Sequence, residues 1–217
     1  MSKAGKKAYS IIRSRILSGD FPPKTHLKEE ELTTLCDVSR TPIREALRSL
    51  AADYYVEIIP NRGTFVTDWS SDDVEDIFNM RMLLEGYAAQ QAVVKATPED
   101  IEELTTYCNN IDLLLSQDGP IDVEAFLAEN RLFHRKLWQA SGSKRLSALL
   151  LRLVAQPVVA RTVMAYTRQD IRRKNEHHRE IIEAIKAKDS AWARSIMSSH
   201  ILAARHVYTL AFLDDPS

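Results

Sequence analysis

Three histidines occupy apolar stretches of helical periodicity in the second half of this 217-residue chain. His134 follows Asn130 by one helical turn, so their side chains share one face of a helix. His178 precedes a run of isoleucines and His200 lies in an apolar stretch, where an unpaired imidazole costs free energy. A single histidine in such a place is most often hydrogen-bonded within the core. The alternative is that the three imidazoles, with Asn130, converge from three helices on one divalent metal ion.

A second group of residues that could bind a ligand is a set of arginines near the N-terminus. Ser39 precedes a predicted helix and can cap it, and Pro42 stands in the first turn, where its missing N–H costs nothing. Thr41, Arg44 and Arg48 lie on the face opposite an apolar stripe. That stripe consists of Ile43, Ala46, Leu47 and Leu50. A helix with one apolar face and arginines on the other suits the DNA major groove, although an ordinary solvated face has the same pattern.

The elements around this helix predict how it is held. A helix over Ala8–Leu17 and a short helix over Lys28–Leu35 precede it, as the spacing of their apolar residues indicates. Two β-rich runs follow it, Val56–Ile59 and Thr64–Val66, on either side of a turn that contains Gly63. Three helices followed by a hairpin make a winged helix-turn-helix.

Two separated segments, Ser39–Leu47 and Ile59–Val66, resemble the N-terminal domain of the GntR-type bacterial transcription regulators, in the order and at the distance found in that family. The resemblance implies that the wing glycine, Gly63, approaches the minor groove of an operator. We add Arg48, from the exposed face of the same helix, and Arg62, beside the wing glycine, to the predicted DNA contacts. The other contacts that the resemblance implies are Ser39, Arg40, Thr41 and Arg44.

The charge distribution supports a DNA-binding N-terminal region. Residues 1–67 hold 11 lysines and arginines against 8 acidic residues, a net charge of +3, whereas the remainder carries a net charge of −4. Attraction to phosphate requires a basic surface, but so small an excess predicts weak binding by one copy, and hence a homodimer on a palindromic double-stranded operator. Glu30 stands where the family usually has an arginine. Its carboxylate repels phosphate, which predicts weaker operator binding or a different sequence preference.

The second two thirds of the chain lack strand signals and are helical almost throughout. The sequence therefore predicts a mainly α protein, with a bundle of six or seven helices after the winged helix-turn-helix. We expect the DNA-binding domain over residues 1–67, a linker over 68–71, and a helical domain for effector binding and dimerisation over 72–213. Asp72 and Glu75 fit a capping box at its start. The predicted helices cover residues 72–94, 97–116, 122–140, 144–156, 158–168, 172–187 and 190–212.

Three segments of the helical region resemble the effector domain of the FadR subgroup of GntR-type regulators: Asn130–His134, Glu176–His178 and Ser199–Ile201. Many members of this subgroup bind zinc or a similar ion through an Asp-x-x-x-His segment and two later histidines. His177 points about 100° away from its neighbour around the helix, so it is not a predicted ligand. The resemblance implies a site for zinc, or else nickel or manganese, at Asn130, His134, His178 and His200.

Asn130 departs from the subgroup pattern, which usually has an aspartate at this position. With an amide and three neutral imidazoles as ligands, a divalent ion keeps its full charge and favours an added anion. We therefore expect a small carboxylate as the effector. Arg81 matches an arginine that often reaches the effector carboxylate in the family, and a guanidinium is the natural bidentate partner for such a group. The alternative for Arg81 is an ion pair with Glu85, four residues later, and both can occur in different ligand states.

Together these residues predict a DNA-binding transcription regulator that senses a small carboxylate through a bound metal ion. One alternative is a regulator that responds to the metal itself, and another is a structural metal or none, because of Asn130. A metal-dependent hydrolase is disfavoured, since the sequence has no His-Glu-x-x-His segment, nucleophile elbow or glycine-rich phosphate loop. We expect no enzyme activity.

Composition also indicates the compartment. No apolar run is long enough to span a bilayer, and the basic N-terminus lacks the apolar core of a secretory signal. The two cysteines, Cys36 and Cys108, fall in different predicted domains and give no sign of a disulfide. These features predict a cytoplasmic protein with no membrane partner.

Overall fold

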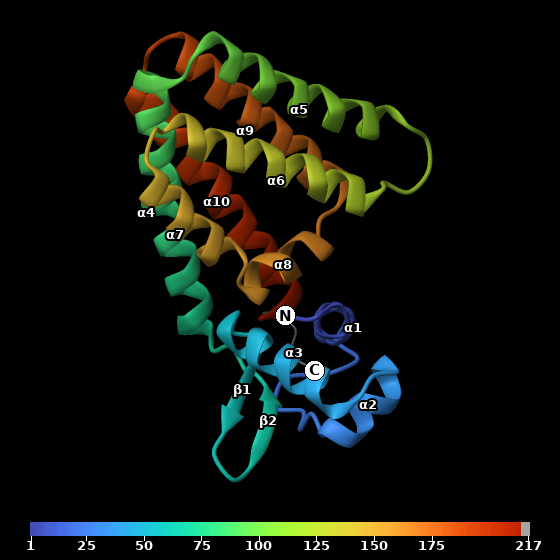
Figure 1. Cartoon of the computed structure of the whole chain (residues 1–217). Coiled ribbons are helices and arrows are strands. Elements are labelled where there is room, and N and C mark those ends of the chain that lie inside the picture. The colour runs from blue at the N-terminus through green and yellow to red at the C-terminus, as the bar shows by residue number, and fades with distance from the viewer. Residues whose placement is uncertain (214–217) are drawn as a thin grey trace. The chain divides into compact units, whose positions relative to one another are not determined.

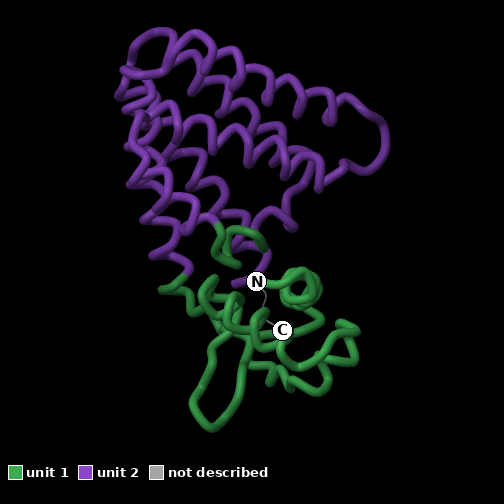
Figure 2. The backbone as a smooth tube through the Cα atoms, in the orientation of Figure 1, with its two compact units in different colours: residues 1–73, 155–161 green, residues 74–154, 162–217 purple. Residues whose placement is uncertain are grey.

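The computed structural model describes residues 1–213, which form two compact units. One unit comprises residues 1–73 together with 155–161, and the other comprises residues 74–154 and those from 162 onward. Figure 2 shows the two units in different colours. Within the described residues, three helices are followed by a two-stranded hairpin and seven further helices (Figure 1). The protein is mainly α, as the sequence predicts.

The first unit is a three-helix core with a β-hairpin. Helices α1 (Lys3–Ser18) and α2 (Glu29–Cys36) pack against α3 (Arg40–Ala52), which also contacts the first strand of the hairpin. Strands β1 (Val56–Ile59) and β2 (Gly63–Val66) pair in antiparallel register. This arrangement confirms the winged helix-turn-helix. The largest buried side chains of its core are Ile12, Leu32, Ile43, Leu50 and Tyr55.

Local signals set the ends of these helices. The hydroxyl of Ser2 accepts a hydrogen bond from the backbone N–H of Gly5 at 3.0 Å, so α1 begins well before its predicted start at Ala8. Gly19 ends this helix with a φ of 87°, in the left-handed region that favours glycine. Ser39 occupies the N-cap position of α3, but its side chain makes no capping hydrogen bond. The predicted capping role of the Ser39 hydroxyl is therefore wrong.

The second unit is built from long helices. The helices from residue 71 onward are α4 (Ser71–Lys95), α5 (Pro98–Ser116), α6 (Val123–Ala140), α7 (Lys144–Val154), α8 (Pro157–Met164), α9 (Arg168–Lys186) and α10 (Ser190–Phe212). Helix α5 packs against α6 and α9, α9 packs against α10, and α6 packs against α7. Figure 1 shows α5, α6 and α9 running alongside one another. The seven helices agree with the predicted bundle of six or seven, although the residues of α8 up to 161 group with the first unit.

The start of α4 is set by Ser70 and Asp73 and not by the predicted pair, Asp72 and Glu75. The backbone N–H of Ser70 donates to the Asp73 carboxylate at 3.0 Å, and the backbone N–H of Asp73 donates to the Ser70 hydroxyl at 3.1 Å. This reciprocal pattern satisfies two N–H groups that the helix itself leaves unpaired. The capping box is therefore shifted by two residues from its predicted place.

Helix α9 also begins before its predicted start. Thr167 and Asp170 form a capping box there, which their spacing in the sequence could have indicated. Arg168 then fastens the beginning of α9 to the end of α5 and the following loop, because its guanidinium donates to the carbonyls of Leu115 and Gly119 at 2.7 and 2.6 Å. Helix α9, which carries His177 and the predicted ligand His178, is thus anchored at its N-terminal end.

Two observations bear on the expectations from composition. No single described helix is long and apolar enough to cross a membrane, although α7 and α8 have the length and composition when taken together as a bent pair. Both cysteines are free and buried, Cys36 in α2 and Cys108 in α5. Burial raises the pKa of the Cys108 thiol to about 12.

Candidate metal centre and nucleic-acid interface

Three helices bring the predicted histidine ligands together. His134 comes from α6, His178 from α9 and His200 from α10, and all three are buried. Each offers a ring nitrogen, and these three nitrogens lie within 4.8 Å of one another. The ring centroid of His178 lies 5.2 Å from that of His134 and 4.8 Å from that of His200. Residues far apart in the sequence thus form one compact imidazole cluster.

The cluster contains buried polar atoms that no described residue satisfies. Both ring nitrogens of His178 and Nδ1 of His200 have no hydrogen-bond partner, and neither has Oδ1 of Asn130, which precedes His134 by four residues on α6. Leaving such a group unpaired costs about 1–3 kcal/mol. Burial, more than any neighbouring charge, lowers the pKa of both His178 and His200 well below the usual value, so these imidazoles are neutral. Neutral imidazoles with free lone pairs are what a divalent metal ion requires, and the donor set therefore fits one.

Glu85 connects the histidine cluster to Arg81. Nε of Arg81 donates to Oε1 of Glu85 at 2.8 Å, and Nδ1 of His134 lies 2.9 Å from Oε2 of the same carboxylate. Burial alone would raise the pKa of Glu85, but the charges and hydrogen bonds of Arg81 and His134 lower it to about 2. The carboxylate is therefore ionised, and it occupies the position of the carboxylates that orient metal-binding histidines.

The sequence predicted only part of this arrangement. The ion pair of Arg81 and Glu85, one of the two roles that the sequence predicts for Arg81, is present. The contact between Glu85 and His134 was not foreseen, because it joins α4 to α6 and no local pattern encodes it. His177 is half-buried, with its ring centroid 5.9 Å from that of His200, and it lies outside the three-histidine cluster.

A buried lysine near the cluster is also absent from the residues that the sequence patterns predict to be functional. Lys174 lies on α9 one helical turn before His178, and only 5% of its surface is exposed. Its ammonium lies 4.8 Å from the centroid of the Tyr166 ring. Burial, aided by the charge of Arg81, lowers the pKa of Lys174 to about 7. The apolar periodicity of Ile171, His178 and Ile181 could have placed this lysine on the buried face of its helix.

The residues predicted to contact DNA all lie on the surface of the first unit. They come from the N-cap of α3, from α3 itself and from the wing, and none of them is buried. These exposed residues are Ser39, Arg40, Thr41, Arg44, Arg48, Arg62 and Gly63. The hydroxyl of Ser39 is not engaged in capping and so remains available for an external partner.

One predicted DNA contact is already engaged by a carboxylate. Nε of Arg44 donates to both oxygens of Glu29, at 2.8 and 2.9 Å. The sequence predicts that Glu30, the next residue, is the group that opposes phosphate. The structure shows that Glu29, at the start of α2, is the carboxylate that contacts the recognition helix. Glu30 is exposed.

The wing requires glycine at position 63 for two reasons. Gly63 has a φ of 105°, in the left-handed region that side chains disfavour. A Cβ atom at this position would also lie 2.5 Å from Nε2 of His26. The His26 ring is held there by stacking on Phe65, with ring centroids 4.6 Å apart. The backbone of the wing turn is therefore bare on the side that faces His26.

Comparison with known proteins gives the family. The model of the gntR family of bacterial regulatory proteins matches residues 4–66, and the model of the FCD domain matches residues 76–203. An HTH-type transcriptional regulator in the TAR-I ttuE-ttuC' intergenic region of Agrobacterium vitis is 30% identical over 139 residues, which cover 63% of this chain and 81% of that protein. The HTH-type transcriptional repressor GlaR of Escherichia coli K12 is 25% identical over 204 residues, 89% of this chain and 90% of that protein.

Solved structures show the same fold. The structure of E. coli McbR/YncC superposes with a TM-score of 0.74 at 21% identity, covering 98% of this chain and all of the other. A GntR-type regulator from Rhodococcus sp. RHA1 superposes with a TM-score of 0.70. The named relatives are transcription regulators and not enzymes. The chain belongs to the GntR family of DNA-binding transcription regulators, in the subgroup whose C-terminal region is an FCD domain.

Proposed function

We propose that the helical unit of this regulator holds a divalent metal ion and senses a small carboxylate at that ion. The observation that supports this most strongly is the cluster of His134, His178 and His200, in which His178 and His200 have neutral imidazoles with unpartnered ring nitrogens. Asn130, one turn before His134, offers an amide oxygen as the fourth ligand. Of zinc, nickel and manganese, we propose zinc as the ion that best suits imidazole ligands, with the other two as alternatives.

The effector proposal follows from charge. Three neutral imidazoles and an amide leave a divalent ion with its full positive charge, so an anion is favoured as a further ligand. Arg81 uses Nε to bind Glu85, and its terminal nitrogens have no hydrogen-bond acceptor among the described residues. A carboxylate held by the metal and by this guanidinium meets two positive groups at once. Glu85 contributes by orienting both His134 and Arg81.

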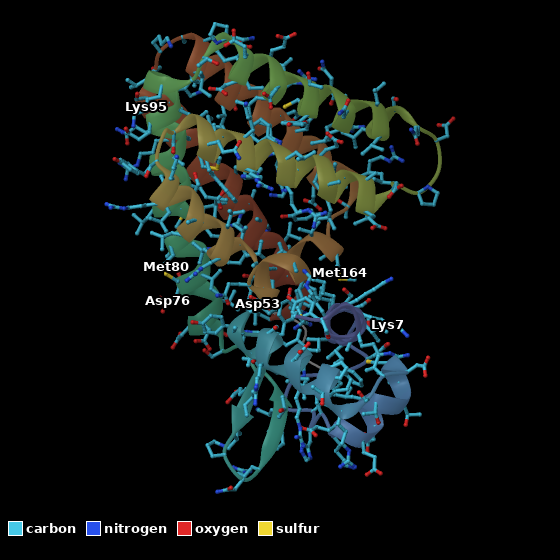
Figure 3. The ribbon with its side chains drawn as sticks, in the orientation of Figure 1. Lys7, Asp53, Asp76, Met80, Lys95 and Met164 are labelled. Atoms are coloured by element: carbon cyan, nitrogen blue, oxygen red, sulfur yellow. The ribbon has the colours of Figure 1, made fainter. Side chains whose placement is uncertain are left out.

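We propose that the regulator acts as a homodimer on a palindromic operator. Helix α4 exposes a row of large apolar side chains at helical spacing, and a second copy of this chain would cover them. These residues are Met80, Leu83, Tyr87 and Val94, with exposed fractions of 44%, 62%, 48% and 71%. Figure 3 labels Met80 on this helix. Replacement of Leu83 by Glu should give monomers in sedimentation velocity at micromolar concentration. An unchanged dimer would show that this face of α4 is not the dimer interface.

Effector binding would change operator affinity by shifting the balance between two arrangements of the dimer. A coupling of about 1.4 kcal/mol between the effector site and the operator gives a tenfold change in affinity. The residues proposed to bind the operator are those exposed on α3 and the wing: Ser39, Arg40, Thr41, Arg44, Arg48, Arg62 and Gly63.

Metal analysis by plasma mass spectrometry tests the proposal directly. Full-length protein, purified without chelators and then incubated with zinc and desalted, should retain about one equivalent per chain. The variants His134→Ala and His200→Ala should lose it, whereas His206→Ala should keep it, because His206 is exposed on the same helix as His200. Wild-type protein that retains no zinc, nickel or manganese would overturn the metal site.

A second candidate function rests on Asn130. An amide in place of a carboxylate weakens the site, and a weak site could respond to the supply of the metal itself. The two candidates differ in one measurement. If zinc alone changes operator binding and carboxylates have no further effect, the regulator senses the metal. If zinc-loaded protein changes its operator affinity only when a carboxylate is added, it senses the carboxylate.

A further inference from the structure

Lys174 is a buried cation without an anionic partner. No ion pair or hydrogen bond joins its ammonium to another residue in the described part of the chain, and the ammonium lies 4.8 Å from the centroid of the Tyr166 ring. Buried lysines are almost always paired, since an uncompensated charge in the interior is strongly destabilising. The function proposed so far uses only the metal ligands and Arg81, and leaves this side chain without a role.

The surroundings of Lys174 carry more positive than negative charge. Arg81 and Lys174 are both buried, and Arg173, next to Lys174 in the chain, pairs with Asp170 through a terminal nitrogen at 2.8 Å. Glu85, which is buried, and Asp170 are the carboxylates whose charges act on Lys174. Glu85 is paired with Arg81, and its other oxygen lies 2.9 Å from Nδ1 of His134. A metal ion would add further positive charge. The positive charge of the site therefore favours the binding of more than one negative group.

The position of Lys174 places this extra charge beside the metal centre. It precedes His178 by four residues on the same face of α9, a rise of about 6 Å along the helix. Arg81 is joined to the same cluster through Glu85, which pairs with Arg81 and lies 2.9 Å from Nδ1 of His134. A short molecule bound at the histidines can therefore reach the lysine.

We propose that Lys174 binds a second acidic group of the effector, so that the site selects dianions, such as short dicarboxylates, over monocarboxylates. This inference rests on the proposed metal-carboxylate site: one carboxylate meets the metal and Arg81, and the other acidic group meets Lys174. A bound anion would give Lys174 the partner that the protein itself does not supply. Lys174 is thus a specificity residue that reads the charge of the effector.

Calorimetry on zinc-loaded full-length protein tests the proposal with matched ligands. Succinate and its monoamide, succinamate, have nearly the same shape but differ by one negative charge. Malonate and adipate vary the separation of the two carboxylates, and 3-phosphonopropionate replaces one carboxylate by a phosphonate. We expect the best dicarboxylate to bind at least tenfold more tightly than its monoamide. The phosphonate tells whether the second group is read as a carboxylate or as a phosphate-like anion.

Variants assign the preference to the lysine. Lys174→Met keeps the length of the side chain and removes its charge, and it should bind dicarboxylate and monoamide with equal affinity while keeping its zinc. Lys186→Met, at an exposed lysine of the same helix, should keep the wild-type preference. Equal binding of both ligands by the wild type, or an unchanged preference in Lys174→Met, would overturn the role of Lys174.

The two proposals fail in different ways. If the wild-type protein retains zinc and binds acetate and succinamate as tightly as any dicarboxylate, the metal-carboxylate site stands and the second anion contact is wrong. If zinc-loaded protein binds none of these acids, or zinc does not bind, the proposed function itself is wrong, and the inference about Lys174 falls with it.

Discussion

In the first unit the residues proposed to meet a ligand lie on the surface, whereas in the second unit they are enclosed. Every buried side-chain nitrogen or oxygen that lacks a hydrogen-bond partner within residues 1–213 belongs to the helical unit. Native proteins leave few such groups unsatisfied, so their concentration in one unit points to something that binds there. The winged unit can fold fully before it meets DNA, while the helical unit retains unsatisfied groups that a ligand would complete.

The first effect concerns the exposed surface of the winged unit. We expect Arg44→Ala to lower the affinity for a palindromic operator, selected from random DNA, by at least about 30-fold, because a dimer loses one contact in each half-site. The salt dependence of binding should become shallower. Fluorescence anisotropy measures both, with Arg152→Ala, at an exposed position on α7, as the control. A loss of operator affinity below threefold would show that Arg44 does not contact DNA. It would also weaken the contrast between exposed ligand residues in the first unit and enclosed ones in the second.

The second effect concerns the stability of the enclosed site. Lys174→Met should stabilise the ligand-free protein by roughly 1–4 kcal/mol, since replacing a buried charge by an apolar side chain of similar volume relieves its desolvation. Differential scanning calorimetry should show a rise of several degrees at neutral pH. A lower melting temperature in the variant would mean that Lys174 has a partner in the folded protein, and the contrast between the units would be smaller.

The same variant has a pH signature. Burial lowers the pKa of Lys174 from 10.5 to about 7 in the folded state. Between these values the unfolded chain binds more protons than the folded chain, so wild-type stability rises with pH. The advantage of Lys174→Met should therefore be nearly full at pH 7 and shrink as the pH approaches 10.5. Unfolding by urea at pH 7 and at pH 9.5 measures the change, and an advantage that does not shrink would contradict it.

A third prediction separates the two units functionally. Glu85→Gln should lower zinc affinity about 10- to 100-fold, as the loss of a carboxylate that orients a ligating histidine does elsewhere. Operator affinity of the metal-free protein should not change. Competition with a chromophoric chelator gives the zinc affinity, and Glu75→Gln, at an exposed carboxylate on the same helix, is the control. Equal zinc affinity in both variants would show that Glu85 serves only to pair with Arg81.

The smallest effect should follow from Glu29→Gln. Glu29 holds Arg44 by a surface ion pair, and such pairs contribute little to stability. Removal of its charge frees the guanidinium and takes a carboxylate away from the DNA-facing surface, so operator affinity should rise about two- to fivefold. Glu31→Gln on the same helix should leave it unchanged. A fall in affinity would show instead that Glu29 holds Arg44 in the orientation that DNA requires.

The contrast between the units also explains what the sequence could predict. The recognition helix and the wing follow from local signals, such as Pro42, the apolar stripe of α3 and Gly63, and the structure places them as expected. The three histidines could be found because each stands on an apolar face of its own helix. The contact of Glu85 with His134 could not, because it depends on how α4 meets α6. Lys174 shows that a charge within an apolar periodicity can be overlooked even when the pattern contains it.

The origin of the three histidines from three helices has a consequence for the life of the protein in the cell. An ion held by His134, His178 and His200 would join α6, α9 and α10 as a removable crosslink, with 43 and 21 residues between successive attachment points. Such a ligand stabilises the folded state by mass action and slows the local opening that proteases exploit. The amount of regulator, as well as its occupancy of the operator, would then depend on the supply of metal.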